Sequence, residues 1–117
     1  MTDIAFEKVP HKSPTSPEKR AALMADPGFG KVFSDHMVTI KWTPDKGCHQ
    51  AQRRAREPFQ IDPAAAVLHY AQEIFEGMKA YRLPDGGFAL FRPEQNARRL
   101  NASAKRMAMP ELPEDVF

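Results

Sequence analysis

The 117-residue chain is 42% hydrophobic and 27% charged, which is the composition of an ordinary globular protein of one domain. Its formal charge of +2 is too small to demand a nucleic-acid partner. A single cysteine, Cys48, excludes an internal disulfide, and no apolar run approaches the ~20 residues of a membrane span. Because the amino terminus also lacks the basic start and apolar stretch of a secretory signal, we expect a cytoplasmic protein.

Residues 1–27 contain four prolines and charges of both signs. Each proline removes a backbone donor and disfavours helix in the residue before it, so we expect an extended amino-terminal arm. Within the arm, the sequence predicts one short helix from Glu18 to Ala25, ended by Asp26-Pro27-Gly28. The first dozen residues are expected either to be disordered or to dock against a partner subunit.

Two strands and a short helix are predicted next. Val32–Trp42 alternates well enough for a strand, and Thr43–Gly47 has the composition of a turn. A second, edge-type strand is predicted within residues 48–60, around Pro58–Gln60. Asp62 followed by proline suggests a helix N-cap, so a short helical turn is expected over Pro63–His69.

A β-hairpin and a helix complete the expected fold. Runs of aromatic and aliphatic residues flank the cluster Pro84–Gly87, in which Gly86 or Gly87 can adopt a positive φ at little steric cost. After the hairpin, Pro93 opens a helix that runs to about Met107. Its buried stripe recurs at three- and four-residue steps, over Ala97, Leu100, Ala104 and Met107. We therefore expect an α+β fold, an antiparallel sheet with a packed helix.

The first strand of the hairpin has an informative alternation. Phe75, Gly77 and Lys79 would share one face, and Glu76 and Met78 the other. A glycine inside a strand marks either a bulge or a place where something approaches the backbone closely. The pattern therefore permits two interpretations: a bulge beside a core phenylalanine and a solvated lysine, or a pocket floor for a small anion with an apolar tail.

The same residues carry a family resemblance. The run Leu68-His69-Tyr70, then Phe75-Glu76-Gly77-Met78-Lys79-Ala80-Tyr81, then Leu90-Phe91-Arg92-Pro93 with Asn96 and Arg99, resembles the branched-chain amino acid aminotransferases. The resemblance continues upstream through Phe29-Gly30-Lys31-Val32-Phe33-Ser34-Asp35-His36-Met37 and Trp42, and so covers residues 28–117. These are fold-type-IV enzymes that depend on pyridoxal 5'-phosphate. The resemblance implies ping-pong transamination between leucine, isoleucine or valine and 2-oxoglutarate.

Arg99 is the strongest single candidate for a binding residue. It lies about 100° round the predicted helix from Leu100, so its stem can be buried while its planar fork faces a cleft. Bidentate geometry of this kind suits phosphate recognition. The alternative is a surface arginine that covers the core. In the resembled family the arginine at this point of the motif binds the cofactor phosphate, and the resemblance implies the same role for Arg99.

The resemblance also implies a substrate pocket. Phe29, Tyr70 and Phe75 would line it for the substrate side chain, and Gly77 and Lys79 match motif positions beside the substrate. Tyr70 in this family reaches into the active site of the neighbouring subunit, which implies a homodimer. The alternative for the three aromatic residues is an ordinary core position, because the periodicity fits both readings equally well.

The chain is expected to be the amino-terminal part of a longer enzyme. Leu112–Phe117 reads as the first turn of a further helix, and members of the resembled family are much longer. Residues 28–117 would then be an incomplete small domain. The lysine that holds the cofactor belongs to the larger carboxyl-terminal domain, and no lysine here matches its motif. We therefore expect a chain that supplies one wall of the site, has no catalytic residue of its own and is inactive alone.

Other functions compete with this interpretation. Related type-IV transaminases and lyases share the sheet, and a truncated product with only an interaction role is a further possibility. A basic anion- or RNA-binding module is a rival from another class, supported by the residues Arg53, Arg54, Arg56, Arg92, Arg98, Arg99, Lys105 and Arg106. A metal site is not expected, because the histidines and Cys48 lack the spacing of ligands. Ser34-Asp35-His36 cannot form a catalytic relay, because consecutive strand residues alternate faces.

Overall fold

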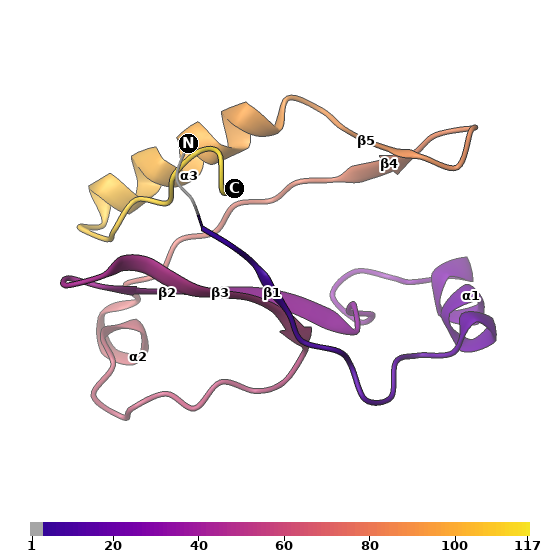
Figure 1. Cartoon of the computed structure of the whole chain (residues 1–117), viewed down its shortest axis with the longest axis horizontal. Helices are drawn as coiled ribbons and strands as arrows, with labels where there is room; N and C mark the ends of the chain where they lie inside the picture. Colours follow the sequence, from indigo (N-terminus) through magenta and orange to yellow (C-terminus); the bar gives the residue numbers. More distant parts are fainter. Residues whose placement is uncertain (1–3) are drawn as a thin grey trace. The chain divides into compact units, whose positions relative to one another are not determined.

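The computed structural model describes residues 4–117 (Figure 1), so the first three residues of the predicted arm lie outside the described residues. The chain groups into two compact units, Ile4–Phe59 and Gln60–Phe117. The division that the sequence predicts at residue 27 falls inside the first unit, and it stays a prediction about the longer enzyme. None of the helices in residues 4–117 is long and apolar enough to cross a membrane.

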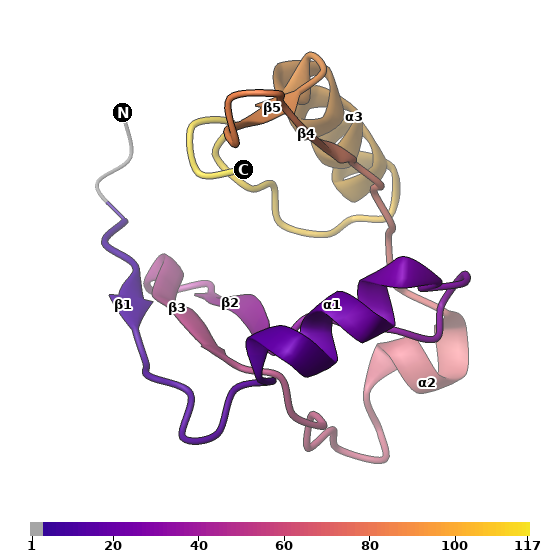
Figure 2. The same ribbon diagram turned by 90° about the vertical axis from the view of Figure 1, so that its right-hand side faces the viewer.

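The first unit is built on a three-stranded sheet of order β1-β3-β2. It consists of β1 (Glu7–Lys8), β2 (His36–Thr43) and β3 (Gly47–Ala55). β2 and β3 form an antiparallel hairpin, and β1 lies parallel beside β3 (Figure 2). The backbone N–H of Lys46 donates to the carbonyl of Thr43 at 3.2 Å, which confirms the turn predicted at this point.

The second strand is confirmed within the predicted residues 48–60, but neither its edge character nor its position around Pro58–Gln60 is correct. β3 runs over Gly47–Ala55 and is the central strand, whereas Pro58–Gln60 lies outside any strand and the edge positions belong to β1 and β2. The physical reason is the tight turn, which returns the chain directly alongside β2 so that pairing begins at Gly47 opposite Thr43. The predicted strand Val32–Trp42 starts four residues late, at His36, and a register shift between Thr39 and Lys41 breaks its alternation.

The amino-terminal arm is attached to this sheet at two places. The predicted helix is confirmed as α1 (Pro17–Ala25), with the Ser16 hydroxyl accepting from the backbone N–H of Lys19 at 3.3 Å. Just before it, Thr15 donates to Asp35 at the start of β2. β1 pairs with β3, so disorder is the wrong expectation for Glu7–Lys8. Docking of the arm against a partner subunit stays a prediction.

The second unit contains two helices and a short hairpin. Its elements are α2 (Ala66–Tyr70), β4 (Ala80–Arg82), β5 (Phe88–Leu90) and α3 (Pro93–Arg106). β4 and β5 pair antiparallel, which confirms the hairpin. Gly86 takes a φ of +85°, and the backbone N–H of Leu83 donates to the carbonyl of Gly87 at 2.9 Å. β4 begins only at Ala80, so the expected strand residues Phe75–Lys79 form an extended segment before it.

Asp62 organises a turn rather than the helix predicted to follow it. Its carboxylate accepts from the backbone N–H of Ala64 at 2.7 Å, and its carbonyl accepts from the N–H of Ala65 at 2.9 Å. α2 therefore begins at Ala66 and not at Pro63. It ends where Ala71 adopts a left-handed φ of 48°, which turns the chain into the extended segment.

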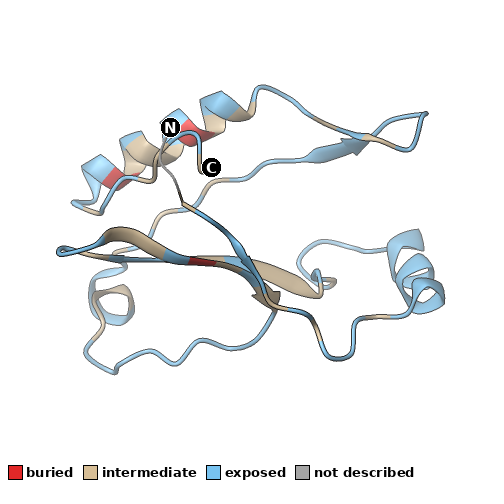
Figure 3. Ribbon diagram, in the orientation of Figure 1, coloured by how far each residue is buried: buried red, intermediate tan, exposed pale blue. Residues whose placement is uncertain are grey.

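α3 supplies the buried part of the second unit. It spans the predicted range, and Ala97 and Ala104 are buried on it, as the two red bands in Figure 3 show. The buried stripe is narrower than predicted, because Leu100 is half-buried and Met107 is exposed. The carboxyl-terminal tail turns back along the helix (Figure 1), where the Asn101 side chain exchanges hydrogen bonds of 2.7 and 2.9 Å with the backbone of Leu112.

The predicted α+β class is confirmed, but the single antiparallel sheet is wrong. The strands of residues 4–117 form two separate sheets, one mixed and three-stranded, the other antiparallel and two-stranded. The sequence pattern indicates which segments are extended, whereas the grouping into sheets depends on pairings between residues that are distant in the chain.

Candidate functional site

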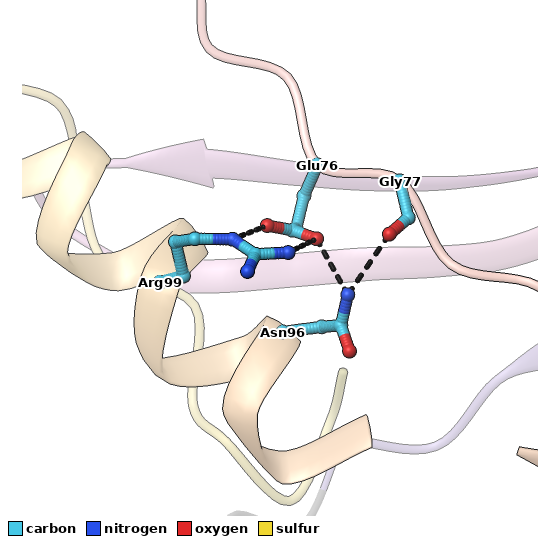
Figure 4. Close-up of polar contacts among 4 residues, drawn as sticks. All are labelled: Glu76, Gly77, Asn96 and Arg99. Carbon is cyan, nitrogen blue, oxygen red and sulfur yellow. Dashed lines mark hydrogen bonds and ion pairs between the residues drawn. The ribbon is translucent and has the colours of Figure 1, made fainter. Parts of the chain in front are cut away.

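Arg99 on α3 faces Glu76 in the extended segment (Figure 4). Its Nη2 donates to Oε2 of Glu76 at 2.8 Å, and its Nε donates to Oε1 of the same carboxylate. The two parallel bonds make a bidentate pair, the strongest arrangement of these two groups. The Glu76 side chain is only 6% exposed, whereas the Arg99 side chain is 66% exposed. The carboxylate is therefore enclosed, and the guanidinium remains open to solvent.

Asn96 joins the same cluster from one turn earlier on α3. Its side-chain nitrogen donates to Oε2 of Glu76 at 2.6 Å and to the backbone carbonyl of Gly77 at 2.9 Å, as Figure 4 shows. Residues three apart on a helix lie on the same face, so Asn96 and Arg99 act on the extended segment together. The cluster of Glu76, Asn96 and Arg99 thus fixes Glu76 and Gly77 to the helix.

The cluster is fully ionised at neutral pH. Hydrogen bonds from Arg99, and then from Asn96, lower the pKa of Glu76 to about 2. The same carboxylate raises the pKa of the Arg99 guanidinium above its ordinary value. Both shifts arise because each charged form is stabilised by the opposite charge and by the hydrogen bonds that it accepts or donates.

A cationic hollow of about 270 Å³ lies on one side of Arg99. It is bordered by Gly77 and by three cationic side chains, those of Lys79, Arg92 and Arg99. Nζ of Lys79 lies 5.4 Å from the centroid of the Tyr81 ring, which is within the range of a cation–π interaction. Three cations around a hollow of this size suit a small anion such as a phosphate or a carboxylate.

The same arginine also lines a second, mainly apolar hollow of about 420 Å³. Its lining includes Ile74, Phe75 and Met107 together with Arg99. The Phe75 ring also reaches toward Gly77, since a Cβ at that glycine would lie 3.5 Å from its Cζ. Phe75 and Arg99 thus line one hollow, and Arg99 lines both hollows.

The structure brings some of the predicted site residues together and leaves others apart. Phe75, Gly77, Lys79 and Arg99 border the cationic hollow or the apolar hollow. Tyr70, at the end of α2, is 82% exposed and lines neither of these two hollows.

Phe29 belongs to the other unit and is 100% exposed. With Phe75 at 90%, all three aromatic residues are open to solvent. The alternative that Phe29, Tyr70 and Phe75 are core residues is therefore wrong.

Two residues of the cluster were missed as site residues by sequence reasoning. The alternation places Glu76 on the strand face opposite Phe75. If Phe75 faces a hollow, the opposite face is the one that packs against the helix, so the alternation could have indicated that Glu76 contacts the helix. Asn96 lies three residues before Arg99, which is the spacing of neighbours on one helical face. The neighbouring Arg98, by contrast, is exposed and pairs with Glu114 at 3.4 Å.

The chain is similar to known proteins that are described as branched-chain-amino-acid aminotransferases. No family model matches the chain. It is 56% identical over 117 residues to a probable branched-chain-amino-acid aminotransferase of Streptomyces coelicolor, and the match covers 100% of the chain and 32% of the relative. It is 53% identical over 114 residues to a branched-chain-amino-acid aminotransferase of Mycolicibacterium smegmatis, covering 97% of the chain and 31% of the relative.

A relative from yeast matches a smaller part. The chain is 46% identical over 90 residues to a cytosolic branched-chain-amino-acid aminotransferase of Saccharomyces cerevisiae, a match that covers 76% of the chain and 24% of the relative. The chain therefore spans about a third or less of the length of the curated relatives that it matches.

Proposed function

Because the chain is homologous to the amino-terminal part of branched-chain-amino-acid aminotransferases, we propose that it forms one wall of an enzyme that transfers the amino group of leucine, isoleucine or valine to 2-oxoglutarate. This chain together with a segment corresponding to the rest of the relatives is called the complete enzyme below. In it, residues 28–117 serve as the small domain on the substrate side, and residues 1–27 serve as its arm.

We propose pyridoxal 5'-phosphate as the cofactor. When bound, it supplies the electron sink that amino-group transfer needs. Arg99 fits its phosphate because the guanidinium is planar, permanently charged and 66% exposed at the edge of the cationic hollow. The observation that carries the proposal is that this arginine lines both the cationic hollow and the hollow lined by Phe75.

The apolar hollow suits the side chain of the substrate. A branched aliphatic chain forms no hydrogen bonds, so it is selected by apolar area and shape, at ~1–3 kcal/mol per methylene. Phe75 supplies apolar area there, and Gly77 and Lys79 lie beside it at the cationic hollow. Phe29 and Tyr70 complete the pocket in our proposal, with Tyr70 contributed to the neighbouring subunit of a homodimer. Their exposure supports this role, since neither ring is engaged in a core.

The reactive group lies outside these 117 residues. None of the lysines matches the motif of the lysine that carries the cofactor in the resembled family, so the chain alone is inactive in this proposal. What the chain does in this proposal is bind the phosphate and shape the side-chain pocket. A cytoplasmic location is part of the proposal, supported by the name of the yeast relative, which describes that protein as cytosolic.

The test compares two adjacent arginines in the complete enzyme. Leucine-dependent glutamate formation and the amount of pyridoxal phosphate retained after dialysis are measured for the wild type, Arg99→Ala and Arg98→Ala. We expect Arg99→Ala to lose the cofactor. Arg98→Ala is expected to keep it, because Arg98 pairs with Glu114 away from the cluster. A wild type without leucine-dependent glutamate formation would refute the function, and unchanged retention in Arg99→Ala would remove Arg99 from the site.

A further inference from the structure

The cluster around Arg99 contains an acid that the proposed function does not use. The Glu76 side chain is only 6% exposed, and its two oxygens accept three hydrogen bonds, from Nε and Nη2 of Arg99 and from the amide of Asn96. We propose that Glu76 is a positioning residue, which holds the plane of the Arg99 guanidinium so that its remaining edge meets the cofactor phosphate. This inference rests on the proposed function.

The geometry shows why a partner is useful at this position. An arginine side chain has many rotamers, and 66% of this one is open to solvent. A single hydrogen bond would leave the guanidinium free to rotate about it, whereas two parallel bonds to one carboxylate fix both its plane and its rotation. Glu76 engages Nε and Nη2 and leaves Nη1 to other acceptors (Figure 4).

The pairing orients the guanidinium without removing its charge. The carboxylate raises the pKa of Arg99, so the fork stays protonated, and Lys79 and Arg92 add two further cations around the cationic hollow. The opposite possibility is that Glu76 competes with a phosphate for Arg99. If Glu76 is a competitor, removing its charge strengthens phosphate binding. If Glu76 is a positioning residue, removing its charge weakens phosphate binding.

Asn96 couples the orientation of the arginine to the backbone beside the hollow. The same amide that donates to Glu76 also donates to the carbonyl of Gly77, which borders the cationic hollow. Glu76 and Gly77 are adjacent in an extended segment that precedes the ladder of β4. The segment therefore takes its position at this point from side chains of α3, and a change at Glu76 is transmitted both to Arg99 and to the glycine.

The experiment separates phosphate recognition from general damage by using two ligands. Equilibrium binding of pyridoxal phosphate and of pyridoxal, which lacks the phosphate, is measured on the complete enzyme after removal of its cofactor. Glu76→Gln keeps the shape of the side chain but turns one acceptor into a donor. We expect this variant to bind pyridoxal phosphate about tenfold more weakly and to bind pyridoxal as the wild type does, because a loss of this size is usual when the partner that orients a binding group is removed.

Glu73→Gln is the matched control, since Glu73 is an exposed acid three residues before Glu76, and both ligands should bind it as they bind the wild type. Unchanged or tighter binding of pyridoxal phosphate to Glu76→Gln would overturn the inference, and so would an equal loss for both ligands.

Two further variants keep the result interpretable. In an Arg99→Gln background, Glu76→Gln should cause no further loss of affinity for pyridoxal phosphate, because the guanidinium that Glu76 positions is gone. An additional loss would contradict the inference. Should Glu76→Gln fail to fold, Glu76→Asp takes its place, since it keeps the charge and withdraws the carboxylate by one methylene. It is expected to show the same selective weakening of pyridoxal phosphate binding. A variant that binds each ligand as tightly as the wild type does would count against the inference.

The two hypotheses fail in different ways. A wild type that does not bind pyridoxal phosphate in preference to pyridoxal refutes the proposed function itself. A wild type with that preference, together with a Glu76→Gln variant that keeps it in full, refutes only the positioning role.

Discussion

The two units hold their extended segments by different means. In Ile4–Phe59, β2 and β3 pair through their backbones from His36 opposite Ala55 to Thr43 opposite Gly47. In Gln60–Phe117, the ladder of β4 and β5 covers three residue pairs, and the segment before it is attached to α3 by side chains. A backbone ladder depends little on which side chains it carries. The position of Glu76 and Gly77 therefore rests on a few polar residues, and single substitutions should affect the second unit more.

Two carboxylates show the same contrast. Asp35 in the first unit accepts from the hydroxyl and the backbone N–H of Thr15, at 2.6 and 3.0 Å, and these bonds hold its pKa below the usual value. Glu76 accepts from a cation as well as from an amide, and these bonds lower its pKa to about 2. A neutral donor links two segments of the first unit, whereas a charged donor in the second unit is also available for a ligand.

The largest expected effect comes from protonating Glu76, because this weakens an ion pair and three hydrogen bonds at once. The folded pKa of about 2 lies below the ordinary value of 4.5. The stability that the carboxylate contributes is therefore complete above pH 4.5 and is lost as the pH falls toward 2. The free energy of unfolding of wild type and Glu76→Gln, measured by urea denaturation, should converge across this window; a constant difference would contradict the pairing.

Asn96→Ala is expected to have the next largest effect. It removes the hydrogen bonds to Glu76 and to the Gly77 carbonyl, which at typical values costs about 1–2 kcal/mol. The free energy of unfolding of the complete enzyme, measured by urea denaturation, should fall by this amount. Gln95→Ala on the adjacent helix position serves as the control, and an equal loss in both variants would argue against attachment by side chains.

Gly86→Ala tests the short ladder. Gly86 has a φ of +85°. An alanine held at this φ destabilises the folded state by about 1 kcal/mol. We expect a lower melting temperature and no change in the affinity for pyridoxal phosphate, because the turn lies at the far end of the hairpin from the cluster. A loss of affinity in this variant would mean that the ladder, and not α3, positions the extended segment.

Gly77→Ala should have the smallest effect on stability. Its φ is not in the positive region, and a new Cβ would meet the Phe75 ring at 3.5 Å, an ordinary contact. The methyl group would narrow the cationic hollow that Gly77 borders. Thermal unfolding should thus match the wild type while the affinity for pyridoxal phosphate falls. A large loss of stability would show that the glycine is required by the fold and not by a ligand.

Much of the local structure can be predicted from the sequence because its signals are local. Prolines and glycines mark the turns before β3 and between β4 and β5, and the spacing of apolar residues marks α3. The position of β3 and the pairing of β1 were missed, since they depend on contacts between distant residues; the Glu7 carboxylate, for example, accepts a hydrogen bond from Gln52, 45 positions away.

The candidate site shows the same limit. The motif singles out Arg99, but a helical pattern does not indicate which acid will meet an arginine across the chain. Glu76 was recognised only as a member of the opposite strand face. Its role follows from its two-bond contact with Arg99 and from its enclosure, and both are properties of the folded unit.

The central claim is that Glu76 and Arg99 together make a phosphate site at the edge of α3. A crystal structure of the complete enzyme with bound pyridoxal phosphate tests it most directly. The account predicts a phosphate oxygen within hydrogen-bond distance of the Arg99 guanidinium, while the same guanidinium keeps both of its bonds to Glu76. A phosphate bound elsewhere, or bound to an Arg99 that has turned away from Glu76, would contradict it.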